Sequence, residues 1–372
     1  MKKFLSLLLV FAMVLTMTAC GAASEPSVAP ESAKTHIVVD HNGNEVELPY
    51  EINRIAVCGI LPLPSVIAIF FDSAEKIVGM SNTSMTAAEN SLLGELYPEI
   101  LKAETGFING TNVNVEELLK LQPDVVFYHA SQKEVGDTLR RAGFPAVAIS
   151  VNKWDYNCIE TLNNWISLLS EIFPDNDKTA IVEEYSNKIY DLVQSRVSSL
   201  PEESRERAFF LYQYSDTVMM SSGKHFFGQW WCDAIGAKNV AEEVETDNQI
   251  TVNLEQVYAW NPSLVFITNF TTANADDLYN GSVGNDDWSA IQAVERGRVY
   301  KMPLGMYRSF TPGVDTPVTL LWLAKTAYPD LFADIDIITE TKTYYKEVFG
   351  IDLSDAQAAS IFAPAKDAGT GF

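Results

Sequence analysis

The sequence predicts an α/β protein with two lobes that are joined by one long helix. Short β-branched runs alternate with helix-length segments, which is typical of parallel α/β sheets. The same alternation returns after residue 205, and an amphipathic segment lies between the two halves. One segment of the first half also recurs in the second half. These three observations favour two lobes with a common plan.

Composition and charge narrow the range of functions. The chain has 372 residues, 47% of them hydrophobic, and its 49 acidic and 26 basic residues give a formal net charge of −23. Such a chain is too apolar for intrinsic disorder, and its length suggests about two domains. A phosphate backbone would be repelled, and no basic run longer than Arg140–Arg141 follows the first residues. Nucleic-acid binding is therefore disfavoured.

The first residues are typical of an export signal. Met1–Lys3 is positively charged, and Phe4–Ala19 carries no charge. A bilayer-spanning helix needs about 20 apolar residues, so this run is short for one. Small residues directly precede Cys20, which resembles a bacterial lipoprotein signal; a secretory signal with a chance cysteine is the alternative. We expect a signal peptide over residues 1–19, a lipid on Cys20, a flexible tether over residues 20–36 and an extracytoplasmic location.

The segment after the tether is expected to form the first α/β lobe, over residues 37–175. Asn42-Gly43 between two short extended runs is a strong hairpin signal. Arg54–Cys58 is typical of a buried strand, and Pro64–Phe71 of a helix. Further β-branched runs predict strands at Lys76–Met80, Val125–Tyr128 and Ala146–Ser150.

Residues 176–200 are expected to form the helix that joins the lobes. Apolar residues follow helical spacing between Asp177 and Val197, with charged residues on the opposite face. At about 1.5 Å per residue, this helix could span roughly 30 Å and would be a stiff hinge. The second lobe is assigned to residues 201–372. Its predicted strands are Ala208–Tyr212, Leu264–Thr268 and Arg298–Met302, and its predicted helices are Phe227–Ile235 and Asn253–Trp260.

A sequence repeat relates the two halves. Residues 114–127 recur as residues 253–266, and the Asn, the first Glu, the Pro, the Val and the Phe are identical at matched places. The two asparagines are natural N-caps, and Glu117 and Gln256 stand where they would complete capping boxes. The prolines then end each short helix before a buried strand.

The repeat also places one glutamate at the second helical position of each copy. Capping does not need the side chains of these residues, Glu116 and Glu255. They could complement the helix dipole, which is worth about 0.3–1 kcal/mol each. They could instead form a matched pair of surface contacts.

Several motifs together resemble one protein family. The lipoprotein signal, the hairpin at Asp40–Val46, the paired segments and the run Leu320–Lys325 are similar to substrate-binding lipoproteins of ABC importers. The branch is the one that serves iron–siderophores, haem and cobalamin, and the resemblance covers Ile37–Phe349. It implies two Rossmann-like lobes joined by one long bridging α-helix, with the ligand cleft between the lobes. It also implies that Glu116 and Glu255 dock arginines of the membrane permease.

The resemblance implies a protein that captures a small ligand and delivers it to an ABC permease with its ATPase subunits. A ferric siderophore is the expected ligand, and cobalamin or another corrinoid, haem or a metal oxyanion are the alternatives. We expect a monomer without cofactor, resident metal or catalytic residues, which contacts the membrane through its lipid alone. An exported enzyme is a remote alternative, since the chain contains no Gly-x-Ser-x-Gly or His-Glu-x-x-His motif.

Loops at the carboxyl ends of the strands are expected to form the cleft. Aromatic side chains on these loops suit a large, flat ligand. Arg308 is the best candidate for gripping an anion, because its planar fork suits pairs of oxygens. The family often has Arg-x-Trp at this place, whereas this chain has Arg308-Ser309-Phe310. The predicted ligand-binding residues are Trp154, Tyr156, Tyr214, His225, Phe226, Tyr307 and Arg308.

Histidine and cysteine residues leave further alternatives open. His129 and His225, one in each half, could be axial ligands of haem or cobalamin, or ordinary polar residues of the cleft. Without Cys20, the remaining cysteines are Cys58, Cys158 and Cys232. Three thiols cannot all pair within the chain, so at least one buried thiol is expected.

Overall fold

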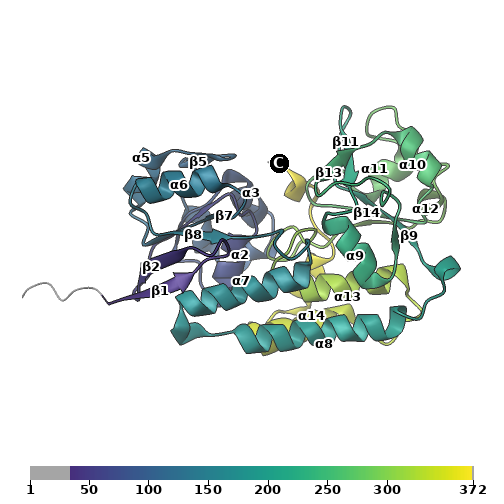
Figure 1. The fold of residues 1–372 in the computed structure, drawn as a ribbon. Coiled ribbons are helices and arrows are strands. Elements are labelled where there is room, and N and C mark those ends of the chain that lie inside the picture. Colours follow the sequence, from purple (N-terminus) through teal and green to yellow (C-terminus); the bar gives the residue numbers. More distant parts are fainter. Residues whose placement is uncertain (1–33, 371–372) are drawn as a thin grey trace, which may run out of the picture. The chain divides into compact units, whose positions relative to one another are not determined.

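The structure of the chain is a computed structural model that describes residues 34–370 (Figure 1). The expected signal peptide, the lipid site Cys20 and nearly all of the tether lie outside the described residues. Two four-stranded parallel sheets, each flanked by helices, form two lobes. The predicted α/β class, with two lobes and one joining helix, is confirmed.

The sheet of the N-terminal lobe is fully parallel, with the strand order β4-β3-β7-β8. Its strands are β3 (Ile55–Cys58), β4 (Ile77–Gly79), β7 (Val125–His129) and β8 (Ala146–Ile149). Every residue of β3 and β8 is buried, as expected for parallel strands that helices cover on both faces. The predicted hairpin is present and consists of β1 (Thr35–Val39) and β2 (Glu45–Pro49).

The remaining elements of this lobe are short. The helices are α2 (Leu63–Phe71), α3 (Asn82–Glu89), α4 (Leu92–Leu96), η1 (Pro98–Lys102), α5 (Val115–Leu121) and α6 (Lys133–Arg141), and a two-residue hairpin is formed by β5 (Ile108–Asn109) and β6 (Asn112–Val113). Helix α5 belongs to the first copy of the sequence repeat.

Helix α8 (Thr179–Val197) joins the lobes. It follows α7 (Cys158–Ile172) and η2 (Pro174–Asn176), and it packs against α7 on one side and against α9 and α13 of the second lobe. Figure 1 shows α8 running alongside α7, α13 and α14. Its apolar stripe, which includes Val182, Ile189 and Val193, is buried. The helix therefore contributes to the core of both lobes.

The C-terminal lobe has a second parallel sheet, with the order β12-β9-β14-β15. Its strands are β9 (Arg207–Leu211), β12 (Lys238–Asn239), β14 (Leu264–Ile267) and β15 (Val299–Lys301). A small antiparallel sheet, which the sequence did not predict, consists of β10 (Gln213–Tyr214), β11 (Met219–Ser222) and β13 (Gln249–Thr251). The helices are η3 (Glu202–Ser204), α9 (Phe227–Ile235), α10 (Leu254–Trp260), α11 (Ala275–Asn280), α12 (Gln292–Glu295) and α13 (Thr316–Ala327).

The end of the chain contacts both lobes. Its elements are α14 (Ile337–Tyr344), the π-helical turn η4 (Tyr345–Phe349), α15 (Asp355–Ile361) and η5 (Lys366–Gly369). Helix α15 packs against α4, where the Gln357 amide donates to Glu95 over 2.9 Å. The turn η5 lies against α3. Part of the segment assigned from sequence to the second lobe thus also touches the first.

The three cysteines within the described residues are free and buried. Burial raises the pKa of the Cys58 thiol to about 12 and raises those of Cys158 and Cys232 well above the ordinary value. These thiols act as small apolar core groups. Over residues 34–370, no helix combines the length and the apolar character needed to cross a membrane.

Candidate functional site

The two copies of the sequence repeat fold alike, with one difference in their caps. The Asn114 side chain accepts the backbone N–H groups of the second and third helical residues of α5. In α10, Asn253 and Gln256 bond each other reciprocally, over 2.9 and 3.0 Å, and complete the predicted capping box. In α5, Glu117 instead pairs with Lys120 over 2.6 Å. The capping box predicted for the first copy is therefore replaced by an ion pair within the helix.

The matched glutamates remain available at the surface. Glu116 and Glu255 are both exposed in the first turns of α5 and α10. Neither carboxylate forms an ion pair with another of residues 34–370. Figure 1 shows α5 and α10 on different lobes and on the same side of the molecule. The pair thus occupies equivalent exposed positions on the two lobes.

An aromatic cavity of about 640 Å³ lies between the lobes. It brings together four of the predicted ligand-binding residues: Trp154, Tyr156, His225 and Phe226. Its other lining residues are Asn152, Asp155, Asn157, Glu160, Lys224, Gln229, Trp230, Asp233 and Asp247. We call it the aromatic cavity below.

Tyr156 connects the two walls of the aromatic cavity. Its ring packs edge-on against Phe226 at 5.2 Å and Phe227 at 4.9 Å, and its hydroxyl donates to Asp247 O over 2.8 Å. Tyr156 and the preceding Asp155 both have positive φ, 58° and 48°. Such backbone costs about 1–3 kcal/mol per residue and is found mainly at functional sites.

The basic groups of the aromatic cavity are already paired. Glu245 accepts from the Lys224 ammonium over 2.5 Å and lies 2.9 Å from Nε2 of His225. The hydrogen bond from Lys224 lowers the pKa of Glu245, and His225 adds to this effect. The cavity also carries Glu160 and Asp233. Its electrostatics therefore do not favour an anion.

The two histidines do not converge on one cavity. His129 lies at the end of β7, where its Nδ1 is 2.8 Å from the Ser131 hydroxyl, and it does not line the aromatic cavity. Burial lowers the pKa of His129, which favours its neutral form. Within residues 34–370, no three His, Cys, Asp or Glu side chains are grouped as a metal site would need.

Arg308 lies at another position on the inner face of the C-terminal lobe. It is fully buried, with 0% of its surface exposed. Its guanidinium lies 5.1 Å from the centre of the Phe270 ring and 5.9 Å from that of Tyr307, and one Nη donates to Thr370 O over 2.8 Å. Burial lowers the pKa of Arg308, although a guanidinium keeps its charge in proteins. This set of groups is called the arginine corner below.

Buried Asp315 holds the loop that carries Arg308. Its carboxylate accepts the backbone N–H of Met306 over 2.8 Å and also accepts the Tyr345 hydroxyl. A Cβ on Gly305 would lie 2.0 Å from Asp315 Oδ1, so no larger residue fits there. The loop conformation, and with it the direction of Arg308, depends on this carboxylate.

Tyr214, one of the predicted ligand-binding residues, does not line the aromatic cavity. Tyr214 is buried in a separate core, where its hydroxyl donates to Asp286 and accepts from the Trp288 indole, each over 2.8 Å. Tyr212 lies instead toward the arginine corner, with its ring 5.0 Å from that of Phe270. Tyr212 directly follows β9, so the rule that ligands bind at the carboxyl ends of strands could have found it.

Comparison with known proteins decides the family. Residues 64–304 match the family model described as periplasmic binding protein. The chain belongs to this family. Its members include substrate-binding proteins of ABC importers, so at family level the chain is an extracytoplasmic solute-binding protein and not an enzyme.

Three relatives show how far the likeness extends. The molybdate-binding protein MolA of Haemophilus influenzae is 27% identical over 349 residues, 87% of this chain and 93% of that protein. The uncharacterized ABC transporter substrate-binding lipoprotein YvrC of Bacillus subtilis is 23% identical and covers 86% of this chain and 95% of its own. A solved periplasmic solute binding protein from Veillonella parvula has a TM-score of 0.78 and 29% identity, and covers 89% of this chain and 97% of that chain.

Proposed function

We propose that this binding protein captures an anionic ligand at the arginine corner and delivers it to the permease and ATPase subunits of an ABC importer. The observation that supports this is the complete burial of Arg308 on the inner face of one lobe. A guanidinium attracts an anion more strongly in the low dielectric of the interior than at the surface, so a buried guanidinium beside a ligand cleft favours anions. Acidic residues predominate in the rest of the chain and repel anions. The positive charge of Arg308 therefore marks this corner as the place where an anion would bind.

A tetrahedral metal oxyanion of the molybdate class is the first candidate. The planar fork of Arg308 offers paired donors to neighbouring oxygens. Tyr212 and Tyr307 lie beside it, and burial raises the pKa of both phenols, so each keeps its proton for donation. MolA, one of the most similar relatives, is named for binding molybdate.

A ferric siderophore, the ligand expected from sequence, is the second candidate. The aromatic cavity supports it, because a volume of about 640 Å³ and the Trp154, Tyr156 and Phe226 side chains suit a large flat chelate. The acids that line this cavity argue for a neutral or cationic ligand there instead. Haem and cobalamin receive less support, since His225 is paired with Glu245 and His129 lies outside the cavity.

Titration of the purified protein separates these ligands. Molybdate, tungstate, sulfate, a ferric catecholate siderophore, haem and cobalamin are each added, and binding is followed by calorimetry and tryptophan fluorescence. We expect molybdate to bind and Arg308→Ala to weaken it about 100-fold, since hydrogen bonds to a charged group are each worth about 1.5–3 kcal/mol. Arg141→Ala, at an exposed arginine, is the control. Equal anion binding by Arg308→Ala and the wild type would refute the proposal.

The permease contact is assigned to the matched glutamates. Glu116 and Glu255 are exposed, unpaired within the described residues and borne by equivalent helices of the two lobes. Such charges at a rim set orientation and encounter rate rather than ligand affinity. We place the protein on the outer face of the cell membrane, or in the periplasm, as a monomer held by a lipid on Cys20; the lipoprotein YvrC supports the anchor.

A further inference from the structure

The last described residues of the chain contact both lobes. We call residues 363–370 the C-terminal strap. Its helical turn η5 packs against α3 of the N-terminal lobe, while its side chains and backbone bond the C-terminal lobe. Figure 1 draws this final turn in yellow between the sheets of the two lobes. Three contacts fix the strap there.

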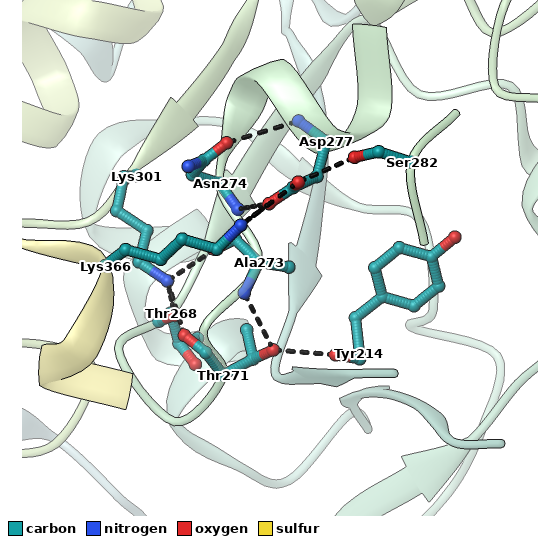
Figure 2. A network of polar contacts seen from close by, with 9 residues as sticks. All are labelled: Tyr214, Thr268, Thr271, Ala273, Asn274, Asp277, Ser282, Lys301 and Lys366. Carbon is teal, nitrogen blue, oxygen red and sulfur yellow. Dashed lines mark hydrogen bonds and ion pairs between the residues drawn. The ribbon is translucent and has the colours of Figure 1, made fainter. Parts of the chain in front are cut away.

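The first contact is an ion pair between the strap and α11. The Lys366 ammonium lies 3.1 Å from the Asp277 carboxylate, which also accepts the Ser282 hydroxyl and the backbone N–H of Asn274 (Figure 2). Asp277 is held in one orientation by these bonds, so it offers a fixed site for the ammonium. The ion pair therefore gives the strap a defined register on the lobe.

The second contact is a close backbone approach at Gly369. A Cβ on this residue would lie 2.1 Å from Thr271 O and 2.6 Å from the backbone N of Thr272. The loop it touches is held in place, because the half-buried Lys301 ammonium donates to the carbonyls of Thr268, Thr271 and Ala273 over 2.6–2.8 Å (Figure 2). Because this loop is held, a residue larger than glycine at position 369 should displace the strap rather than the loop.

The third contact is made to the proposed ligand anchor itself. The Arg308 guanidinium donates to the backbone carbonyl of Thr370 over 2.8 Å. A carbonyl is a weaker partner for a guanidinium than an anion is, because bonds between two charged groups are about twice as strong as neutral ones. The strap thus gives one Arg308 nitrogen a partner that a ligand can replace.

We propose that the C-terminal strap is a built-in competitor that occupies the arginine corner of the empty protein and is displaced by the anionic ligand. Competition between the strap and an anionic ligand rests on the proposed function. The position of the strap on the arginine corner does not depend on it. If the strap covers Arg308 in about nine of ten molecules, only about one in ten can bind ligand, and the apparent ligand affinity falls about tenfold. It would also help release the ligand at the permease, since the strap can replace the ligand on Arg308 as it leaves.

Gly369→Val tests the seating in the full-length protein without any ligand. Valine cannot fit against the Thr271 carbonyl, so the strap should leave while the fold remains. Ala365→Val adds bulk at an exposed position of the same strap and is the matched control. Phenylglyoxal, which modifies accessible guanidinium groups, is the probe, and peptide mass spectrometry reads the labelling rate of Arg308. We expect about a tenfold faster rate in Gly369→Val than in the control.

A chain that ends at Phe362 and the variant Lys366→Glu provide independent tests of the same seating. Both should unmask Arg308, whereas Lys346→Glu, which breaks an exposed ion pair with Asp352, should not. Equal labelling of Arg308 in the wild type, Gly369→Val and the shortened chain would overturn the inference.

The competition is tested separately with molybdate as the probe. Gly369→Val and the shortened chain should bind it about tenfold more tightly than the wild type and Ala365→Val. If Arg308 is labelled faster in these variants but their molybdate affinity is unchanged, the strap does not compete with the ligand. Failure of molybdate and the other anions to bind even the shortened chain overturns the proposed anion function, while the labelling rates still decide the seating.

Discussion

Asp315 offers a quantitative test of how the arginine corner is held. The residue is 3% exposed, and burial raises the pKa of its carboxyl group from 3.8 to about 6, against the opposing effect of the Tyr345 hydroxyl and the backbone N–H groups of Met306 and Tyr307. The folded chain therefore binds a proton at this site more tightly than the unfolded chain does. The resulting stabilisation is fully present below pH 3.8 and is lost as the pH rises through about 6.

The size of the effect follows from the shift. Each pKa unit corresponds to about 1.4 kcal/mol, so a shift of about two units is worth about 3 kcal/mol in all. About 2.5 kcal/mol of this falls between pH 4 and pH 7, because the unfolded group is already partly ionised at pH 4. Asp315→Asn removes the titrating group and keeps the shape of the side chain. Other carboxylates titrate in both proteins, and their contributions cancel when the two are compared.

Urea unfolding of the wild type and Asp315→Asn, measured at steps from pH 4 to pH 7.5, provides the assay. We expect the stability difference in favour of the wild type to fall by about 2.5 kcal/mol over this range. Asp352→Asn, at an exposed carboxylate paired with Lys346, is the control for substitution at the surface. A difference that stays constant with pH would refute the reasoning, because it would mean that burial does not shift this group.

Three further predictions concern docking, capping and anchoring. Glu116→Lys combined with Glu255→Lys should abolish uptake of the ligand by cells and leave its affinity for the purified protein unchanged; normal uptake by the double variant would contradict the docking role. Asn253→Ala should lower the free energy of unfolding by about 1 kcal/mol through loss of the α10 cap, as measured with urea, and an unchanged midpoint would count against it. Cys20→Ser should move the protein from the membrane fraction to the soluble extracellular or periplasmic fraction; continued membrane association would exclude the lipid as its anchor.

The fold was predictable because its strands are buried on both faces. Ala146–Ile149 and Leu264–Ile267 are wholly apolar in sequence and wholly buried in the structure, and parallel strands covered by helices produce this pattern. The antiparallel sheet was not predicted, and its strands are only two to four residues long. Strands this short carry too few positions for periodicity to be read.

The site was predictable only in part, because side-chain partners are set by contacts distant in sequence. Tyr214 and Tyr212 both stand near the end of β9, yet the first joins a core with Trp288 and the second lies near Phe270. Lys224 and His225 look like free basic groups in sequence, but Glu245 pairs with both. Neither outcome follows from local spacing, since the partners are 20 or more residues away.

The sequence by itself determined the two-lobe plan, the joining helix and the matched pair of glutamates. These features depend on local periodicity, helix caps and a repeated segment, each of which can be recognised in short stretches of sequence. Only the tertiary structure showed that Arg308 is buried, that Asp315 orients its loop and that Thr370 reaches it from the end of the chain. The charge and environment of a buried group are decided by which distant segments desolvate it, and folding alone brings those segments together.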